Sequence, residues 1–264
     1  EYIQVDESTV PVINNEKHRT VKGYMWCVRD ALHGSVCFSY DFGSRSKATA
    51  RKLLFGYHGN VQTDGYNVYD DFEKVEGITL YGCWAHARRK LVDALDEDNP
   101  KATQGLVYIN KLYHIESLAD EMGLTIEQRR DKRKSEAYPI ICEFEKWLSD
   151  TWCKVLPGSR MGKAIQYIYT LLPRLARYVN DGRINIDNNL IENAIRPLAI
   201  GRKNYLFCGN DDSAVRAAIV YSLISSCKAA EVDPRKWMTD ILRKLPLYKE
   251  SKMDIKELLP LNWK

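Results

Sequence analysis

The chain has 264 residues, of which 45% are hydrophobic and 28% are charged, and its net charge is +4. This composition is typical of a globular protein, and because no run of about 18 apolar residues occurs, we expect no membrane span. The net charge is too small to indicate nucleic-acid binding by itself, so any DNA contact would depend on local basic patches. Seven cysteines without a Cys-x-x-Cys pair predict reduced thiols in a cytoplasmic protein.

The first part, residues 1–96, predicts an antiparallel meander followed by alternating strands and helices. The meander strands, rich in β-branched residues, are expected at 2–12, 20–28 and 35–42. The elements that follow are a helix at 46–55, a strand at 60–64, a helix at 66–72, a strand at 78–81 and a helix at 83–95. This alternation indicates parallel pairing, so we predict an α/β fold. Because strand-like sequence begins at once, without Met or a signal peptide, we expect an N-terminal part to be missing.

Residues 97–183 carry almost no strand signal and predict an all-helical insertion. Its helices are expected at 100–122, 125–149 and 163–179. The run Arg129-Arg-Asp-Lys-Arg-Lys134 has two interpretations, a solvated helix face or a contact with the phosphate backbone of DNA.

The stretch 182–198 predicts a helix with Asp187 as its N-cap. Steps of four residues would place three polar side chains on one face of this helix, namely Asn188, Glu192 and Arg196. A neighbouring face would be buried and carry the apolar side chains of Ile191, Ile195 and Leu198. One interpretation is an amphipathic helix with an internal Glu–Arg pair. The other is the rim of a site that handles a metal ion and phosphate.

The last part predicts an extended segment, two helices and a packed tail. They are expected at 202–207, 213–230, 234–245 and 248–264. Asp233-Pro234 is a strong helix start, and we expect Trp237, Ile241 and Leu242 to be buried on the helix that follows. We predict one catalytic core in two parts, residues 1–96 and 184–247. A helical insertion at 97–183 separates the two parts, and a tail at 248–264 follows the core.

Several common sites are not supported by the sequence. Gly-x-Gly-x-x-Gly, the Walker loop and Gly-x-Ser-x-Gly are absent. A zinc site would need four ligands, whereas the close pairs are two, His33 with Cys37 and Cys83 with His86. A core cysteine beside a hydrogen-bonded histidine explains the second pair without metal.

Three carboxylates predict a magnesium site. Asp64 closes a short strand, Asp6 lies in the first strand, and Glu192 lies on the helix described above. Such acids can hold two Mg²⁺ ions, with Mn²⁺ as a substitute, for phosphodiester displacement. The pattern does not select Asp6 over Glu7, and Asp41 is a further rival.

Four segments resemble bacterial transposases of the insertion-sequence sixty-six family. The first two are Gly59-Asn-Val-Gln-Thr-Asp-Gly-Tyr66 and Gly82-Cys-Trp-Ala-His-Ala-Arg-Arg89. The third is Asp187-Asn-Asn-Leu-Ile-Glu-Asn-Ala-Ile-Arg-Pro197, continued by Gly201-Arg-Lys-Asn204, and the last is Leu258-Leu-Pro-Leu-Asn-Trp263. The resemblance covers nearly the whole chain, with the motifs in the family's order.

The resemblance implies a ribonuclease H-like mixed sheet flanked by helices and interrupted by the helical insertion. It also implies an Asp-Asp-Glu triad of Asp6, Asp64 and Glu192 that binds the metal ions. The side chains expected to contact DNA are Asn188, Asn189, Arg196, Arg202, Lys203, His86 and Arg89. The implied partners are the transposon ends and target DNA, together with accessory transposition proteins. The resemblance also implies a homo-oligomer when DNA is bound. The expected location is the bacterial cytoplasm, at the nucleoid.

The expected activity is metal-dependent cleavage at transposon ends followed by strand transfer into target DNA. A structure-selective nuclease or resolvase with the same fold and metals is an alternative. A non-catalytic DNA-binding protein derived from a transposase is another. Transposases of this family carry an N-terminal DNA-end-binding region, which we expect to lie outside this sequence.

Overall fold

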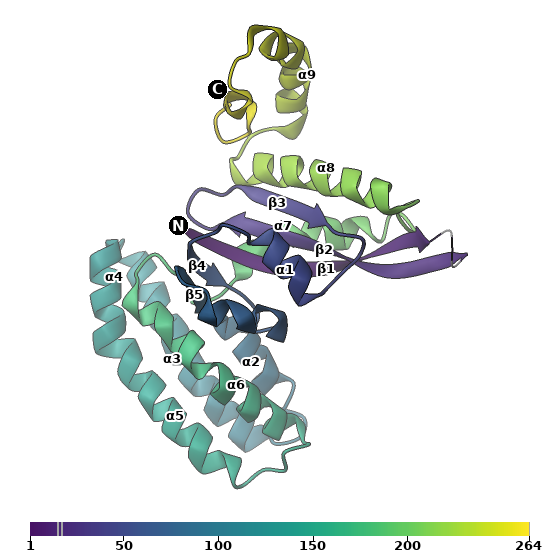
Figure 1. Cartoon of the computed structure of the whole chain (residues 1–264). Helices are drawn as coiled ribbons and strands as arrows, with labels where there is room; N and C mark the ends of the chain where they lie inside the picture. Colours follow the sequence, from purple (N-terminus) through teal and green to yellow (C-terminus); the bar gives the residue numbers. More distant parts are fainter. Residues whose placement is uncertain (15, 17, 264) are drawn as a thin grey trace. The chain divides into compact units, whose positions relative to one another are not determined.

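A computed structural model describes residues 1–14, 16 and 18–263 of the chain. The described residues form two compact units. We call residues 1–59 with 190–264 the sheet unit, and residues 60–189 the helical unit (Figure 1). Strands and helices occur in both, so the predicted α/β class is confirmed, whereas the ribonuclease H-like topology and the domain boundaries stay predictions.

The sheet unit contains the three long N-terminal strands and the C-terminal helices. Its elements are β1 (Tyr2–Asn14), β2 (Arg19–Asp30), β3 (Val36–Tyr40), α1 (Lys47–Leu53), α7 (Asn189–Gly201), α8 (Asp211–Ala229), α9 (Pro234–Ser251) and the 3-10 helix η4 (Ile255–Leu258). The first residue of α7 belongs to the helical unit.

The helical unit contains two short strands and a group of packed helices, although Gly59, the first residue of β4, belongs to the sheet unit. Its elements are β4 (Gly59–Gln62), the 3-10 helix η1 (Asn67–Lys74), β5 (Ile78–Tyr81), α2 (Trp84–Val92), α3 (Asn99–Glu121), α4 (Ile126–Lys132), the π-helix η2 (Arg133–Ala137), α5 (Tyr138–Trp152), α6 (Arg160–Ala176) and the 3-10 helix η3 (Arg177–Asn180). The predicted helix 125–149 is thus α4, η2 and α5 in succession. Among the described residues, no helix has both the length and the apolar character needed to cross a membrane.

The predicted antiparallel meander is confirmed. Strand β1 pairs with β2 antiparallel, with Asp6 opposite Cys27, and β2 pairs with β3 antiparallel. Residues 15 and 17, in the first connection, lie outside the described part of the chain.

The two faces of β1 have different neighbours because successive side chains of a strand point to opposite faces. Val10 and Val12 pack into one apolar cluster with Ile191 and Leu198 of α7. Gln4 and Asp6 have the same parity as these valines and therefore lie on the same face, which α7 covers. Figure 1 shows α7 behind the strands and α1 in front of them.

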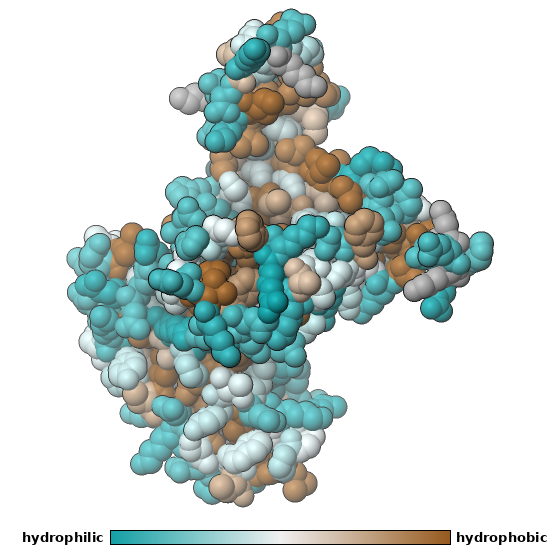
Figure 2. Space-filling model, viewed as in Figure 1, coloured by the Kyte–Doolittle hydropathy of each residue, from teal (hydrophilic) through white to brown (hydrophobic). Residues whose placement is uncertain are grey.

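Helix α8 packs on β3 through polar as well as apolar contacts. The Phe38 N–H donates to Ser222 Oγ at 2.7 Å, and the Val36 N–H donates to Ser226 Oγ at 3.0 Å. Helix α8 also carries exposed apolar side chains, namely Val215, Ile219 and Val220. Figure 2 shows brown, apolar residues over this helix.

Two predictions for the C-terminal part are wrong. Residues 202–204 turn instead of extending, because the Arg202 N–H donates to Leu198 O at 3.1 Å and the chain continues through further turns. Leu242 is 64% exposed, since it lies about 100° around α9 from Ile241, which together with Trp237 faces a small core. The N-cap Asp233 is confirmed, accepting from the N–H of residues 235 and 236.

The basic run at 129–134 is largely paired inside the helical unit. Arg133 is 1% exposed and bonds Glu116, and Arg129 bonds Glu116 and Asp120. Lys132 pairs with Glu136 at 2.7 Å. These ion pairs favour a structural role over a continuous phosphate contact.

Candidate functional site

The helical unit joins the segments that carry the sequence motifs. The amide of Gln62, 0% exposed at the end of β4, donates to Gly82 O and to Asn185 O, each at 2.9 Å. One buried side chain therefore connects the segment before Asp64 with the start of α2 and with the approach to α7. Because the two carbonyls belong to loops, this amide takes the place of regular backbone pairing.

A second set of bonds connects α2 to the same approach. The Trp84 N–H donates to Ile186 O at 3.1 Å, and the Asn188 N–H donates to Cys83 Sγ at 3.4 Å. Cys83 is 1% exposed, and burial raises the pKa of its thiol to about 12 despite backbone N–H groups that lower it. It is a buried hydrogen-bond acceptor in this structure. The described residues contain no group of three or more His, Cys, Asp or Glu side chains that could hold a metal ion.

Asp64 lies in the loop after β4, where its carboxylate accepts from the Tyr66 N–H at 2.8 Å. Its carbonyl accepts from the Tyr167 hydroxyl of α6. The next residue, Gly65, has φ +86°, and an added Cβ would overlap the Leu171 side chain of the same helix. Helix α6 therefore packs directly on the loop that presents Asp64 and fixes its course.

The start of α7 differs from the predicted helix. The helix begins at Asn189, so Asn188 lies before it and does not share a helical face with Glu192 and Arg196. The Asp187 carboxylate accepts from the Asn189 N–H at 3.1 Å, from its side-chain amide at 2.9 Å and from the Tyr113 hydroxyl at 2.8 Å. Asp187 thus stabilises the helix start, as predicted for an N-cap residue, although from one position further out.

The sheet unit places Asp6 and Glu192 on the same side of β1. Gln4 Oε1 accepts from the Ile191 N–H at 3.0 Å, so the first turn of α7 is anchored to the face of β1 that also carries Asp6. Glu192 follows Ile191 in that turn and is half-buried. No local pattern predicts a role for Gln4, because its partner is 187 positions away along the chain.

The two rival acids have other partners. Glu7 has a side chain that is 1% exposed and pairs with Arg45 at 2.5 Å, on the face of β1 opposite Asp6. Asp41 pairs with Lys52 at 2.7 Å and accepts from the Thr49 hydroxyl at 3.0 Å. Both carboxylates contact the α1 region, whereas Asp6 lies on the face of β1 that α7 covers, and the choice among the three acids stays a prediction. Asp64 belongs to the helical unit, and the three-acid metal site stays a prediction.

The residues predicted to contact DNA differ in exposure. Those exposed to solvent are Asn189, Arg196, Lys203 and Arg89, whereas His86 is half-buried. Arg202 is also half-buried and donates to the Thr9 carbonyl at 2.5 Å. Asn188 is 0% exposed, and neither polar atom of its side chain has a hydrogen-bond partner among the described residues.

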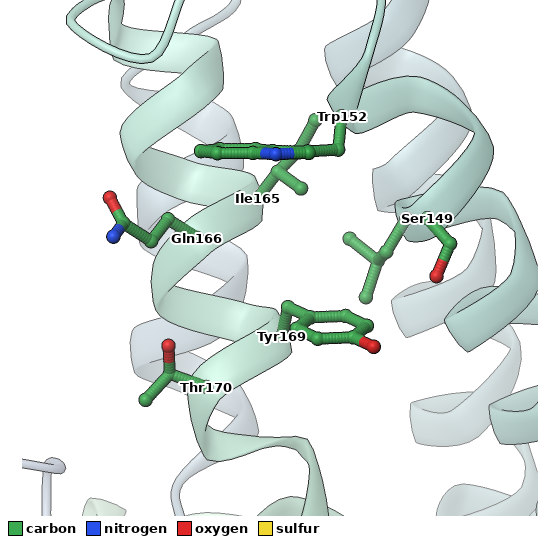
Figure 3. Close-up of a pocket in the computed structure, with 7 residues that line it drawn as sticks. Ser149, Trp152, Ile165, Gln166, Tyr169 and Thr170 are labelled. Carbon is green, nitrogen blue, oxygen red and sulfur yellow. The ribbon is translucent and has the colours of Figure 1, made fainter.

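An aromatic hollow of about 380 Å³ lies between α5 and α6. Figure 3 shows the rings of Trp152 and Tyr169 on either side of it, with Ile165 behind and Ser149, Gln166 and Thr170 around the opening. No charged side chain lines it in the described structure, so it lacks the groups for metal or phosphate chemistry.

Comparisons with known proteins agree with the motifs. A model of the transposase IS66 family matches residues 1–216, and a model of the IS66 C-terminal element matches residues 222–261. Two uncharacterized proteins of Sinorhizobium fredii (strain NBRC 101917 / NGR234), y4qI and y4jD, are 32% and 31% identical over 100% and 98% of this chain. The chain spans about half the length of these relatives, 51% and 53%. No solved structure matches it significantly.

Proposed function

Since this chain belongs to the IS66 transposase family, we propose that it is the catalytic part of a DNA transposase with a ribonuclease H-like fold. It would cleave a phosphodiester at each transposon end and join the released 3′-hydroxyl to target DNA. The observation that supports this best is the bonding of Gln62 to Gly82 and Asn185, which ties the three motif segments together around one buried side chain.

We propose that Asp6, Asp64 and Glu192 hold the metal ions. Their carboxylate oxygens are the donor atoms that Mg²⁺ prefers, and Asp6 and Glu192 lie on the same side of β1 in the sheet unit. Bound Mg²⁺ would activate the attacking oxygen and stabilise the leaving one. The chain itself orients the acids, through Gln4 at the start of α7 and Tyr167 at the Asp64 loop.

The DNA backbone would be held by exposed cations and amides of each unit. Arg196 and Lys203 would contact phosphate from the sheet unit, with Arg202 kept in place by the Thr9 carbonyl. Asn189 and Arg89 would contact it from the helical unit. Asn188 would position the Glu192 turn, and His86 would approach the scissile phosphate.

Replacing Asp64 by Asn tests this proposal. Because an amide oxygen can still accept from the Tyr66 N–H, the variant should unfold at nearly the wild-type temperature. It should lose Mg²⁺-dependent cleavage of DNA that carries the ends of the chain's own mobile element. Asp96→Asn, whose side chain is 93% exposed in the same unit, is the matched control and should cleave normally.

Wild-type cleavage by Asp64→Asn would show that the site is assigned wrongly. Products in which a labelled donor end is joined to target DNA distinguish a transposase from a nuclease or resolvase, which would stop at cleavage. An inactive wild-type chain that still binds DNA would support a non-catalytic role.

A further inference from the structure

A polar hollow of about 510 Å³ lies in the helical unit between α2 and α3. Four residues of α2 line it at helical spacing, so they form one stripe; these are Ala85, Arg88, Arg89 and Val92. The opposite wall is formed by Asn110 and Tyr113, one turn apart on α3, and Asn189 closes one end.

The lining is positively charged. Arg88 and Arg89 are exposed, and among the described residues no carboxylate lines the hollow. The lining is bonded to Asp187, which accepts from the Tyr113 hydroxyl and from both nitrogens of Asn189. These bonds occupy that carboxylate and orient two of the lining side chains. The ligand that fits two guanidinium groups beside amide and phenol groups is a phosphate.

Helix α2, which lines the hollow, also contacts Tyr167, the residue of α6 whose hydroxyl donates to Asp64 O. Burial and the Asp64 charge raise the pKa of Tyr167, whereas the positive charge of Arg89 lowers it, so Arg89 acts on the hydroxyl that donates to Asp64 O. Lys90, next on α2, lies 5.5 Å from the centre of the Tyr167 ring. A backbone phosphate held by Arg88 and Arg89 would therefore place the neighbouring nucleotides beside the Asp64 loop.

We propose that this hollow binds a phosphate of the DNA backbone, with Arg88 as a contact that the motif comparison does not assign. The proposal rests on the proposed function, since it takes DNA as the substrate. Its role is positioning, because phosphate contacts fix the register of the duplex and do not read its sequence.

The test is binding of the chain to a short fluorescent duplex in EDTA, followed by anisotropy over a series of salt concentrations. Arg88→Ala should weaken binding by a similar factor on two unrelated sequences and lower the slope of log K against log salt by about 1. Arg88→Lys keeps the charge and should retain the slope, while affinity falls because the bidentate geometry is lost.

Arg160→Ala is the matched control, since Arg160 belongs to the same unit and its side chain is 62% exposed near Asp96. It should keep wild-type affinity and slope. Unchanged binding by Arg88→Ala, or equal losses in both alanine variants, would overturn the proposal. Because EDTA removes the metal, this binding test does not depend on cleavage. Loss of cleavage in Asp64→Asn with unchanged binding by Arg88→Ala would overturn only the phosphate contact. Weaker binding by Arg88→Ala with wild-type cleavage by Asp64→Asn would overturn only the assigned metal site.

Discussion

Replacing Arg133 by Met should destabilise the helical unit strongly. The Arg133 side chain is 1% exposed and binds both carboxylate oxygens of Glu116, at 2.8 and 2.6 Å. It also donates to the carbonyls of Tyr178 and Asp181, at 3.0 and 2.7 Å, and its guanidinium lies 4.8 Å from the Tyr178 ring centre. The variant would leave a carboxylate that is 9% exposed with the weaker Arg129 contact at 3.0 Å.

The expected loss is about 3–5 kcal/mol in the free energy of unfolding, since breaking a buried ion pair leaves an uncompensated charge. Urea unfolding followed by tryptophan fluorescence and circular dichroism measures it. Glu116→Leu combined with Arg133→Met should be less destabilised than Arg133→Met alone, because the second change removes the stranded charge.

Arg130→Met is the control for charge without burial and should change stability by about 0–1 kcal/mol. A loss below about 1 kcal/mol for Arg133→Met would refute the reasoning, because the pair would then behave like an exposed one. The same result would reopen the interpretation of the 129–134 run as a DNA contact.

Two further predictions concern Gly65 and Cys83. Gly65→Ala should lower the free energy of unfolding, measured in urea, by about 2–5 kcal/mol, because φ +86° strains an alanine backbone and the added methyl overlaps Leu171. Gly56→Ala is the control, since Gly56 has φ +74° with open space around it and the variant should show the backbone strain alone. Equal losses of stability in the two variants would contradict the packing argument. At pH 8, iodoacetamide should modify exposed Cys153 readily and Cys83 only after unfolding, because a pKa of about 12 leaves about a thousandfold less thiolate than the ordinary value of 9.0. Rapid modification of Cys83 in the folded chain, followed by mass spectrometry, would show that it is not buried as described.

Local pattern was sufficient for most of the elements. The strand predicted at 78–81 coincides with β5, and the meander strands end within two residues of β1, β2 and β3. Such segments are predictable because β-branched alternation and helical spacing are properties of neighbouring residues. The buried stripe of α7, with Ile191, Ile195 and Leu198, was predicted for the same reason and is confirmed.

One failure followed from where a helix ends, and the others occurred where a distant contact decides the structure. Residues 202–204 turn because α7 continues to Gly201 and its last carbonyls are bonded by the residues that follow. Leu242 is exposed because the core beneath α9 is small and is filled from the side of Trp237. Asn188 precedes α7 because Asp187 and Gln4 together set where that helix begins.

The amino-acid order alone determined the α/β class, most element positions and, through its motifs, the transposase family. Tertiary structure decided which face of β1 is covered by α7, because alternation along β1 places Asp6 and Glu7 on opposite faces without saying which of them faces that helix. It also brought Gln62, Gly82 and Asn185 into contact. These hydrogen bonds join residues far apart in the chain, so no local pattern could specify them.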